Sequence, residues 1–278
     1  MTERLSIATA AGSFDALAAG PADGRAVLLL HGFPESAREW DRQLTALAAF
    51  GYRAVAVDQR GYSPGVRPTA PADYARAVVA GDVLAILDAL GWDRVDLVGH
   101  DWGASAAWDV AITRPDRLRT PTAISVPHPD AWAAALERDP GQRERLDYMR
   151  FLTREDAAEL LLADGARRQR AMYQGAVPEA QVDAHVALLS QPGAMDAVLN
   201  WYRSIPLGGP SGPVTVPTLF AWGDQDLAFG RIAADAVAEH VTGPYRFAPL
   251  EGITHWVPEQ APEQLNGLLL EHLAAHPA

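Results

Sequence analysis

Short apolar, β-branched runs alternate with longer helical patterns through residues 1–126 of the chain. The clearest runs are AVLLL (26–30), RAVAV (53–57), VDLVG (95–99) and PTAISV (121–126). Helical patterns lie between them, over residues 40–50 and 74–90. Strands joined by helices return the chain to the same end of a sheet each time, so neighbouring strands become parallel. The sequence therefore predicts an α/β fold.

The strand signals stop at residue 127 and resume only after residue 212. The intervening segment consists of helical patterns separated by Gly- and Pro-containing turns, and it ends in the Gly- and Pro-rich stretch PLGGPSGPVTVP (206–217). TLFAW (218–222) and YRFAPL (245–250) then continue the alternation. We expect a mostly parallel sheet flanked by helices over residues 1–126 and 213–278, with a helical cap inserted over residues 127–212.

Composition narrows the possible functions. The chain has 278 residues, of which 49% are hydrophobic, and its net charge of −12 disfavours nucleic acid or an anionic membrane as a partner. The absence of cysteine excludes thiolate nucleophiles, disulfides and Cys-bound metals. MTERLSIATAAGSF has no basic start followed by an apolar run, and no apolar stretch approaches the roughly 18 residues of a membrane span. We expect a cytoplasmic protein that acts on a small molecule; whether it forms a homo-oligomer stays open.

GHDWG (99–103) follows a predicted strand and precedes small residues typical of a helix start. The two glycines permit a sharp turn that exposes Asp101 above the sheet, beside the free N–H groups of the helix N-terminus. This nucleophile-elbow pattern predicts Asp101 as a nucleophile, although an aspartate here can also serve as an N-cap. A second frame, GASAA, centres on Ser105, but it starts four residues after Gly99 and puts Ser105 inside the helix.

Two other loops can supply the base and its partner. His255 comes directly after the last predicted strand and before the last helix, where a histidine can reach the elbow. GDQD follows the strand over 218–222, and a Gly-x-x-Asp loop points to Asp226 as the orienting acid, with Asp224 as a turn residue and Asp130 as the fallback. The order Asp101, Asp226, His255 is the nucleophile, acid, base order expected for this architecture.

HGFPES (31–36) directly follows the strand over 26–30, which we expect to lie next to the strand that ends at the elbow. We expect the main-chain N–H groups of Phe33 and Trp102 to form an oxyanion hole, although HGFPES also fits a simple loop capped by Ser36. The residues predicted to line the substrate pocket are His31, Pro34, His128 and Trp201. The histidines that fall on helical patterns, and are predicted at the surface, are His185, His240, His272 and His276.

HGFPES, DQRGYSPG (58–65), GHDWGA and GITHWVPEQAPEQLN together resemble the α/β-hydrolase fold family and, within it, the branch of epoxide hydrolases and haloalkane dehalogenases. LDYMRFLTREDAAE (146–159) and VLNWYRS (198–204) are similar to the cap segments in which epoxide hydrolases carry two ring-opening tyrosines, which implies Tyr148 and Tyr202. Packing is the alternative role for both. The resemblance implies hydrolysis of a small apolar epoxide to a vicinal diol through a covalent aspartyl ester, with no metal or cofactor. DQRGYSPG departs from the commoner DxRGYGxS pattern, and the acid loop ends in Gly230 instead of proline.

Two other functions stay open at this point. A haloalkane or haloacid dehalogenase would use the same aspartate and would bind halide through Trp102 and an Asn or Trp in the HGxP turn, but that position is Phe33. Fluoroacetate-type relatives favour an arginine next to the nucleophile, where this chain has Trp102. A ligand-binding protein without turnover is the third hypothesis, and the complete set Asp101, Asp226 and His255 argues against it.

Overall fold

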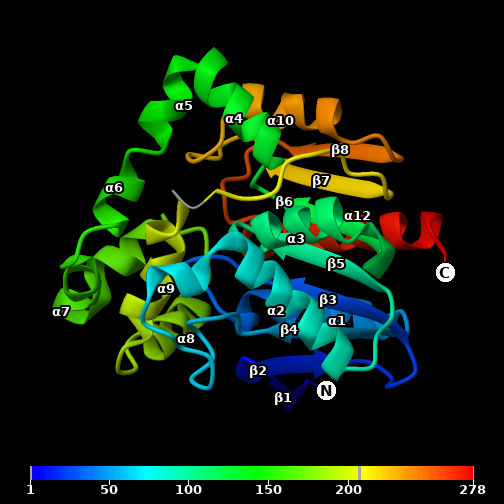
Figure 1. Ribbon diagram of the computed structural model, residues 1–278, viewed down its shortest axis with the longest axis horizontal. Helices are drawn as coiled ribbons and strands as arrows, with labels where there is room; N and C mark the ends of the chain where they lie inside the picture. Colours follow the sequence, from blue (N-terminus) through cyan, green and yellow to red (C-terminus); the bar gives the residue numbers. More distant parts are fainter. Residues whose placement is uncertain (1, 206–207, 278) are drawn as a thin grey trace.

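The computed structural model describes residues 2–205 and 208–277, which form an eight-stranded sheet in the order β1-β2-β4-β3-β5-β6-β7-β8 (Figure 1). From β4 to β8 all neighbouring strands are parallel, whereas β2 is antiparallel to both β1 and β4. The strands are β1 Glu3–Thr9, β2 Gly12–Ala19, β3 Arg25–Leu30, β4 Tyr52–Val57, β5 Val95–His100, β6 Leu118–Ile124, β7 Thr218–Gly223 and β8 Tyr245–Leu250. The predicted α/β fold is confirmed.

Strands β1 and β2 were not anticipated by the sequence patterns. In β2, buried Phe14, Ala16 and Ala18 alternate with more exposed residues. The second face contributes less to the core, through Leu17 and Ala19. Such an edge hairpin lacks the continuous apolar run that marks a strand buried on both faces. Strand β6 also ends before Ser125, which has a positive φ of 68° and turns the chain away from the sheet.

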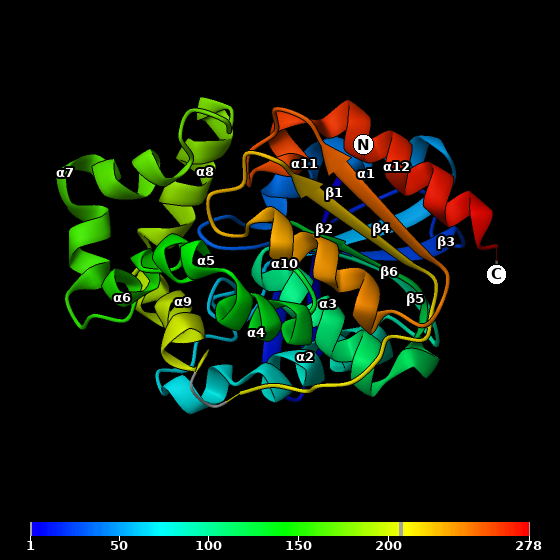
Figure 2. The same cartoon turned by 90° about the horizontal axis from the view of Figure 1, so that it is seen from above.

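Helices cover both faces of the sheet (Figure 2). Helices α1 (Asp41–Ala49) and α12 (Pro262–Ala275) lie on one face, and α2 (Arg76–Ala89), α3 (Trp102–Thr113) and α10 (Arg231–Ala236) lie on the other. In β3, Val27 and Leu29 pack with the first group, whereas Leu28 and Leu30 pack with the second, because successive strand side chains point to opposite faces. The short helices are η1 Ala37–Trp40, η2 Pro71–Tyr74, η3 Pro115–Arg117, η5 Val237–His240 and α11 Val257–Gln260.

A run of helices separates β6 from β7, and we call residues 129–203 the helical segment. Its helices are α4 Pro129–Arg138, α5 Pro140–Arg145, α6 Tyr148–Leu152, α7 Ala157–Met172, α8 Glu179–Leu189 and α9 Ala194–Arg203. Both views place α6 to α9 beyond one end of the sheet, with α4 returning beside α10 (Figures 1 and 2). In the predicted Gly- and Pro-rich stretch after this segment, residues 206 and 207 lie outside the described residues.

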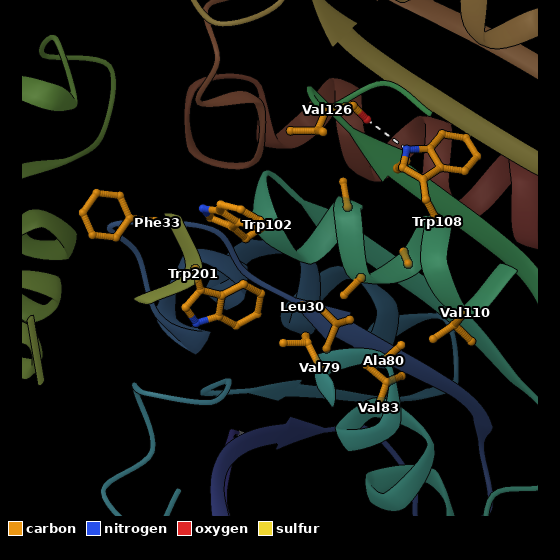
Figure 3. Packing of buried hydrophobic residues seen from close by; sticks show 14 of the residues in the cluster. Leu30, Phe33, Val79, Ala80, Val83, Trp102, Trp108, Val110, Val126 and Trp201 are labelled. Atoms are coloured by element: carbon orange, nitrogen blue, oxygen red, sulfur yellow. Dashed lines mark hydrogen bonds between the residues drawn. The ribbon is translucent and has the colours of Figure 1, made fainter. Parts of the chain in front are cut away.

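The chain leaves the sheet for the helical segment at a fixed point. Trp108 of α3 is fully buried, and its Nε1 donates a 3.0 Å hydrogen bond to the main-chain oxygen of Val126, just after β6 (Figure 3).

Within the described part of the chain, we find no helix with the length and apolar character needed to cross a membrane.

Two predicted surface histidines are in fact buried, which corrects the interpretation of their helical patterns. His185 of α8 has no exposed area, and its Nδ1 lies 2.9 Å from Ser36 Oγ. His272 of α12 is 4% exposed. Sequence periodicity assigns a polar residue to the solvent face, but the faces of α8 and α12 that carry these histidines pack against the rest of the protein.

Candidate active site

Asp101 lies at a strained turn between β5 and α3. Its φ is 51°, a conformation that residues with a side chain rarely adopt. A Cβ atom at Gly99 would collide with the main-chain oxygen of Gly103, one at Gly103 with that of Leu30, and one at Gly32 with the Asp101 side chain. Glycine at these three positions therefore lets the turn close and presents the Asp101 carboxylate at the ends of the parallel strands.

His255 connects the carboxylates of Asp101 and Asp226. Its Nδ1 lies 2.8 Å from Asp226 Oδ2, and its Nε2 lies 3.4 Å from Asp101 Oδ2. The other Asp226 oxygen accepts hydrogen bonds from the N–H groups of Ala228 at 2.7 Å and Phe229 at 3.0 Å. Since the acid is held by main-chain donors, it can fix the orientation of the imidazole ring.

The charges of the two carboxylates control the protonation of His255. Burial opposes its protonated form, but Asp226 and Asp101 outweigh burial and raise the pKa of His255 to about 10. Burial likewise opposes ionisation of Asp101, yet the His255 imidazolium and the Phe33 N–H hold the pKa of Asp101 below its usual value. In this state Asp101 is an ionised carboxylate next to a charged imidazolium.

The HGFPES turn contacts the same carboxylate. The main-chain N–H of Phe33 donates a 2.9 Å hydrogen bond to Asp101 Oδ1. The second predicted oxyanion donor, the N–H of Trp102, is the first of helix α3 and follows Asp101 directly in the chain. Oδ1 thus lies against a main-chain donor, while Oδ2 faces the base.

A narrow cavity of about 20 Å³, room for a water molecule or two, adjoins Asp101. The residues around it are Asp101, Trp102, Ser105, Val126, Trp132, Tyr148, Met149, Tyr202 and Phe229. The two predicted tyrosines are in this set, one from α6 and the other from α9. The structure therefore brings both phenols to the cavity that holds the predicted nucleophile.

Both phenols stay protonated in these surroundings. Tyr148 keeps 38% of its area exposed, yet desolvation of its hydroxyl group, followed by the charges of Asp101 and Asp226, raises its pKa. Burial and Asp101 raise the pKa of Tyr202 well above its usual value. The Tyr202 ring packs edge-on against Trp102 at 5.1 Å and against Phe33 at 5.2 Å between centroids, which fixes its position. Each phenol can donate a hydrogen bond into the cavity.

The residues predicted to line the pocket lie elsewhere. His31 is held inside its own turn, where Nδ1 donates to the Gly32 oxygen and Nε2 accepts from the Gln59 N–H. The carbonyl of Pro34 accepts a 2.6 Å hydrogen bond from Tyr173 of the helical segment. Neither His31 nor Pro34 is among the residues that surround the cavity.

His128 and Trp201 also point away from the cavity. His128 accepts from the Asp130 N–H and donates to the Gly212 oxygen at 3.1 Å, which links the residues that precede and follow the helical segment. Trp201 packs on Trp102 at 5.4 Å between rings, and its Nε1 donates to the Arg60 oxygen at 3.0 Å. Trp201 thus packs against Trp102, a residue of the cavity wall.

The alternative nucleophile Ser105 and the alternative acids Asp130 and Asp224 have other partners than His255. Ser105 lies inside α3, one turn after Asp101, where its side chain joins the cavity wall. Asp130 accepts hydrogen bonds from Ser211 Oγ and the Gly212 N–H, and Asp224 accepts from the Gly252 N–H. Of these acids, Asp226 is the one bonded to His255.

The sequence patterns did not identify most of the apolar wall, which consists of Val126, Trp132, Met149 and Phe229. Trp132 and Phe229 meet edge-on at 5.4 Å because α4 lies beside the loop after β7. Apolar residues of this kind look like ordinary core positions in a sequence, and only the docking of the helical segment assigns them to a cavity.

A family model described as alpha/beta hydrolase fold matches residues 25–258. The AB hydrolase superfamily protein YfhM of Bacillus subtilis is 31% identical over 270 residues, with 92% of each chain covered. Epoxide hydrolase A of Mycobacterium tuberculosis is 30% identical over 298 residues, also with 92% of each chain covered. A solved structure described among novel epoxide hydrolases from metagenomes of hot environments has a TM-score of 0.89 at 28% identity and covers 99% of each chain. The chain therefore belongs to the α/β-hydrolase fold family, within the branch that includes the epoxide hydrolases.

Proposed function

We propose that the protein converts an epoxide and water to a vicinal diol. The observation that carries this proposal is that Tyr148 and Tyr202 adjoin the same cavity as Asp101. A nucleophilic carboxylate would suit several leaving groups, whereas two phenols beside it suit an oxygen that leaves as an alkoxide and needs a hydrogen-bond donor and a proton. The names of relatives such as Epoxide hydrolase A support the same class of substrate.

In the first step, Asp101 Oδ2 attacks a ring carbon and the bond from that carbon to the ring oxygen breaks. Oδ2 is the attacking atom because Oδ1 is engaged by the Phe33 N–H at 2.9 Å. Tyr148 and Tyr202 bind the ring oxygen, and one of them gives it a proton. The product is an alkyl ester of Asp101 that carries a free hydroxyl group.

Ester formation prepares His255 for the second step. The Asp101 charge disappears, so one of the two carboxylates that raise the pKa of His255 to about 10 is lost. The imidazolium proton then passes through solvent to the tyrosine phenolate left by the first step, and neutral Nε2 takes a proton from water as the water oxygen adds to the ester carbonyl. The N–H groups of Phe33 and Trp102 stabilise the oxyanion. On its collapse the bond from the carbonyl carbon to the diol oxygen breaks and that oxygen takes the proton of the added hydroxyl group, so the diol leaves beside the Asp101 carboxylate and protonated His255.

We further propose that residues 127–212 form a cap domain on a core of residues 1–126 and 213–278. Two hydrogen bonds support docking of the cap on this core. Tyr173 Oη donates to the Pro34 oxygen at 2.6 Å, and Trp201 Nε1 donates to the Arg60 oxygen at 3.0 Å. Each joins the helical segment to a loop that follows a core strand. The cap would supply the ring-opening phenols, and the apolar wall would select an apolar substituent on the epoxide.

A dehalogenase is less well supported by the site. A halide needs two N–H donors, and the side chain of Phe33 has none to add to Trp102. The Tyr202 ring packs edge-on against both residues, so a phenol stands beside Trp102 in this site. Haloalkanes therefore serve as the comparison substrate in the experiment below.

A single turnover in heavy-oxygen water, with enzyme in excess over a small aryl epoxide, tests the mechanism. The water oxygen should enter the Asp101 carboxylate, and the first diol released should carry no label. Label that appears directly in the diol, with none in Asp101 after repeated turnovers, would exclude the ester. A panel of epoxides, haloalkanes and p-nitrophenyl esters under the same conditions separates epoxide hydrolysis from dehalogenation, esterase activity and simple ligand binding.

A further inference from the structure

Three glutamates lie together behind Asp101, away from solvent. Glu35 comes from the turn after β3, Glu39 from η1, and Glu259 from α11, four residues after His255. The side chains of Glu35 and Glu39 have no exposed area, and that of Glu259 is 1% exposed. These segments also carry the oxyanion turn and the proposed base, so the glutamates, here called the carboxyl cluster, connect two parts of the site.

His100, the residue before the nucleophile, lies between the carboxyl cluster and the base. Its Nδ1 is 3.1 Å from Glu35 Oε2 and 3.0 Å from Glu39 Oε1, and its Nε2 is 2.9 Å from the main-chain oxygen of His255. A carbonyl oxygen only accepts, so Nε2 carries a proton. A carboxylate next to Nδ1 requires a proton there too, and the geometry therefore fits an imidazolium.

The interior cannot hold the three glutamates as three carboxylates. Beside one imidazolium they would leave two uncompensated negative charges, and buried charge without a partner is strongly unfavourable. Burial, followed by repulsion from Glu39, raises the pKa of Glu35 to about 7. Burial and Glu35 raise the pKa of Glu259 well above its usual value.

The oxygens of the carboxyl cluster have too few hydrogen-bond donors around them, and shared protons would supply the missing donors. Among the described residues, Glu35 Oε1 and both carboxyl oxygens of Glu259 have no hydrogen-bond partner, and neither has Glu39 Oε1, whose 3.0 Å approach to His100 Nδ1 is outside hydrogen-bond geometry. A carboxylic acid supplies an O–H donor that a carboxylate lacks, so a proton on one glutamate can satisfy an oxygen of the next. Glu39 Oε2 additionally accepts from the Gly32 N–H at 3.2 Å, which links the carboxyl cluster to the oxyanion turn.

Other titratable groups face the carboxyl cluster and His100, and they do not supply the missing positive charge. They are Asp101, His255, His31, His185, Tyr62 and Tyr173. Burial lowers the pKa of His31 to about 4 and that of His185 to about 3, so both are neutral at pH 7. The charges of Asp101 and His255 compensate each other.

We propose that Glu35, Glu39 and Glu259 share protons and keep His100 as an imidazolium, which positions the base through the main-chain oxygen of His255. Ser125 Oγ donates to the same oxygen at 2.8 Å, so two donors fix the main chain from which the imidazole extends. His100 is a positioning residue in this proposal. Only its kinetic consequence rests on the proposed function; its protonation state does not.

The protonation of His100 can be measured without substrate. Nuclear magnetic resonance of protein with ¹⁵N-labelled histidine rings, assigned by comparison with His100→Gln, should show both ring nitrogens protonated at pH 8. In Glu35→Gln combined with Glu39→Gln, the ring should be neutral at that pH. A neutral His100 ring in the unmodified protein at pH 7 would overturn the proposal.

Single-turnover kinetics then test the positioning role. Glu35→Gln combined with Glu39→Gln should slow hydrolysis of the ester about tenfold and change alkylation of Asp101 by less than about twofold, because the base acts only in the second step. Asp96→Asn is the matched control. Asp96 is a buried carboxylate on β5, the strand that carries His100, and it is bound to Arg25 of β3. This control variant should lower thermal stability without altering the ratio of the two rates. Equal slowing of both steps in the double glutamate variant would refute the role.

Two outcomes separate this proposal from the function on which it rests. If no epoxide is turned over, the histidine resonances still decide the state of His100. Elemental analysis of the purified protein completes the test: a divalent metal bound one per chain, and lost in Glu259→Gln, would mean that a cation neutralises the carboxyl cluster and that shared protons do not.

Discussion

The main-chain N–H of Phe33 donates to Asp101 Oδ1 at 2.9 Å, across 68 residues of sequence. The carboxylate thus already has one oxygen against the donor that an ester carbonyl would need. If Oδ2 is alkylated, Oδ1 becomes that carbonyl oxygen without any movement of the turn. Such preorganisation costs no rearrangement between the two proposed steps.

Asp101→Asn should abolish formation of the ester. An amide is a far weaker nucleophile than a carboxylate, and turnover of a small epoxide should fall by a factor of about 10⁴ or more. Mass spectrometry of the peptide containing residue 101 should show no adduct after incubation with epoxide. Circular dichroism should confirm an unchanged fold, and an adduct on another residue would contradict the assignment.

His255→Gln should separate the two steps. Asp101 can still attack the ring, but no base activates water, so the ester should accumulate to one equivalent per chain. The adduct mass on intact protein, followed over time, measures this. An enzyme that still completes many turnovers would show that another group serves as the base.

Tyr148→Phe and Tyr202→Phe should each slow alkylation of Asp101 by about 10²-fold, and the double variant should slow it further. The hydroxyl groups act only on the ring oxygen, so the hydrolysis of an ester once formed should change little. Stopped-flow measurement of the two phases tests this. Tyr52→Phe, a half-buried tyrosine on β4, is the control and should behave like the unmodified protein.

The raised pKa of His255 makes stability depend on pH. Burial opposes its protonation, but Asp226 and Asp101 raise its pKa from 6.5 to about 10. The contribution is complete below pH 6.5 and is lost as pH rises through 10, because the folded state binds the proton more tightly than the unfolded chain. The free energy of unfolding should therefore fall between these values by at most about 1.4 kcal/mol per pH unit.

Denaturant titrations across this pH range measure that slope. His255→Gln should remove it, and the difference between the two proteins should be largest at the acidic end. Equal slopes in both proteins would show that folding does not raise the pKa of His255.

Met149→Ala should widen the cavity. Removal of this side chain from the wall should raise the ratio of kcat/KM for a bulky aryl epoxide over a small alkyl epoxide by about tenfold. Met172→Ala, a half-buried methionine outside the cavity wall, is the control. A similar change in both variants would indicate a general loosening of the helical segment.

Local patterns were sufficient for strands β3 to β8 and for the turn around Asp101, but not for the edge hairpin β1–β2. A strand buried on both faces, such as β3, carries a continuous apolar run, and a turn as tight as 99–103 needs glycine, so both are visible in the sequence. The pairing of Asp226 with His255 followed from the order of the loops after the strands. The α/β fold was predicted correctly for these reasons, and the resemblance of the motifs to the α/β-hydrolase family was confirmed by the comparisons.

Features that depend on how distant segments dock could not be read in this way. Trp132 and Phe229 become a cavity wall only when α4 lies beside the loop after β7. Glu39 and Glu259 are charged residues in short helices, and a sequence pattern places such residues in solvent. Their burial results from the packing of η1 and α11 around His100, which no local periodicity encodes.

The site is built from two parts of the chain, the loops that follow the strands and the helical segment. Asp101, Asp226, His255 and the donor at Phe33 all follow core strands, and glycines without room for a side chain fix the turn among them. Apart from Asp101 itself, half of the residues that surround the cavity come from the helical segment, namely Trp132, Tyr148, Met149 and Tyr202. Substitutions in that segment can therefore alter substrate preference while the reacting groups keep their geometry, so selectivity and chemistry are free to evolve at different rates.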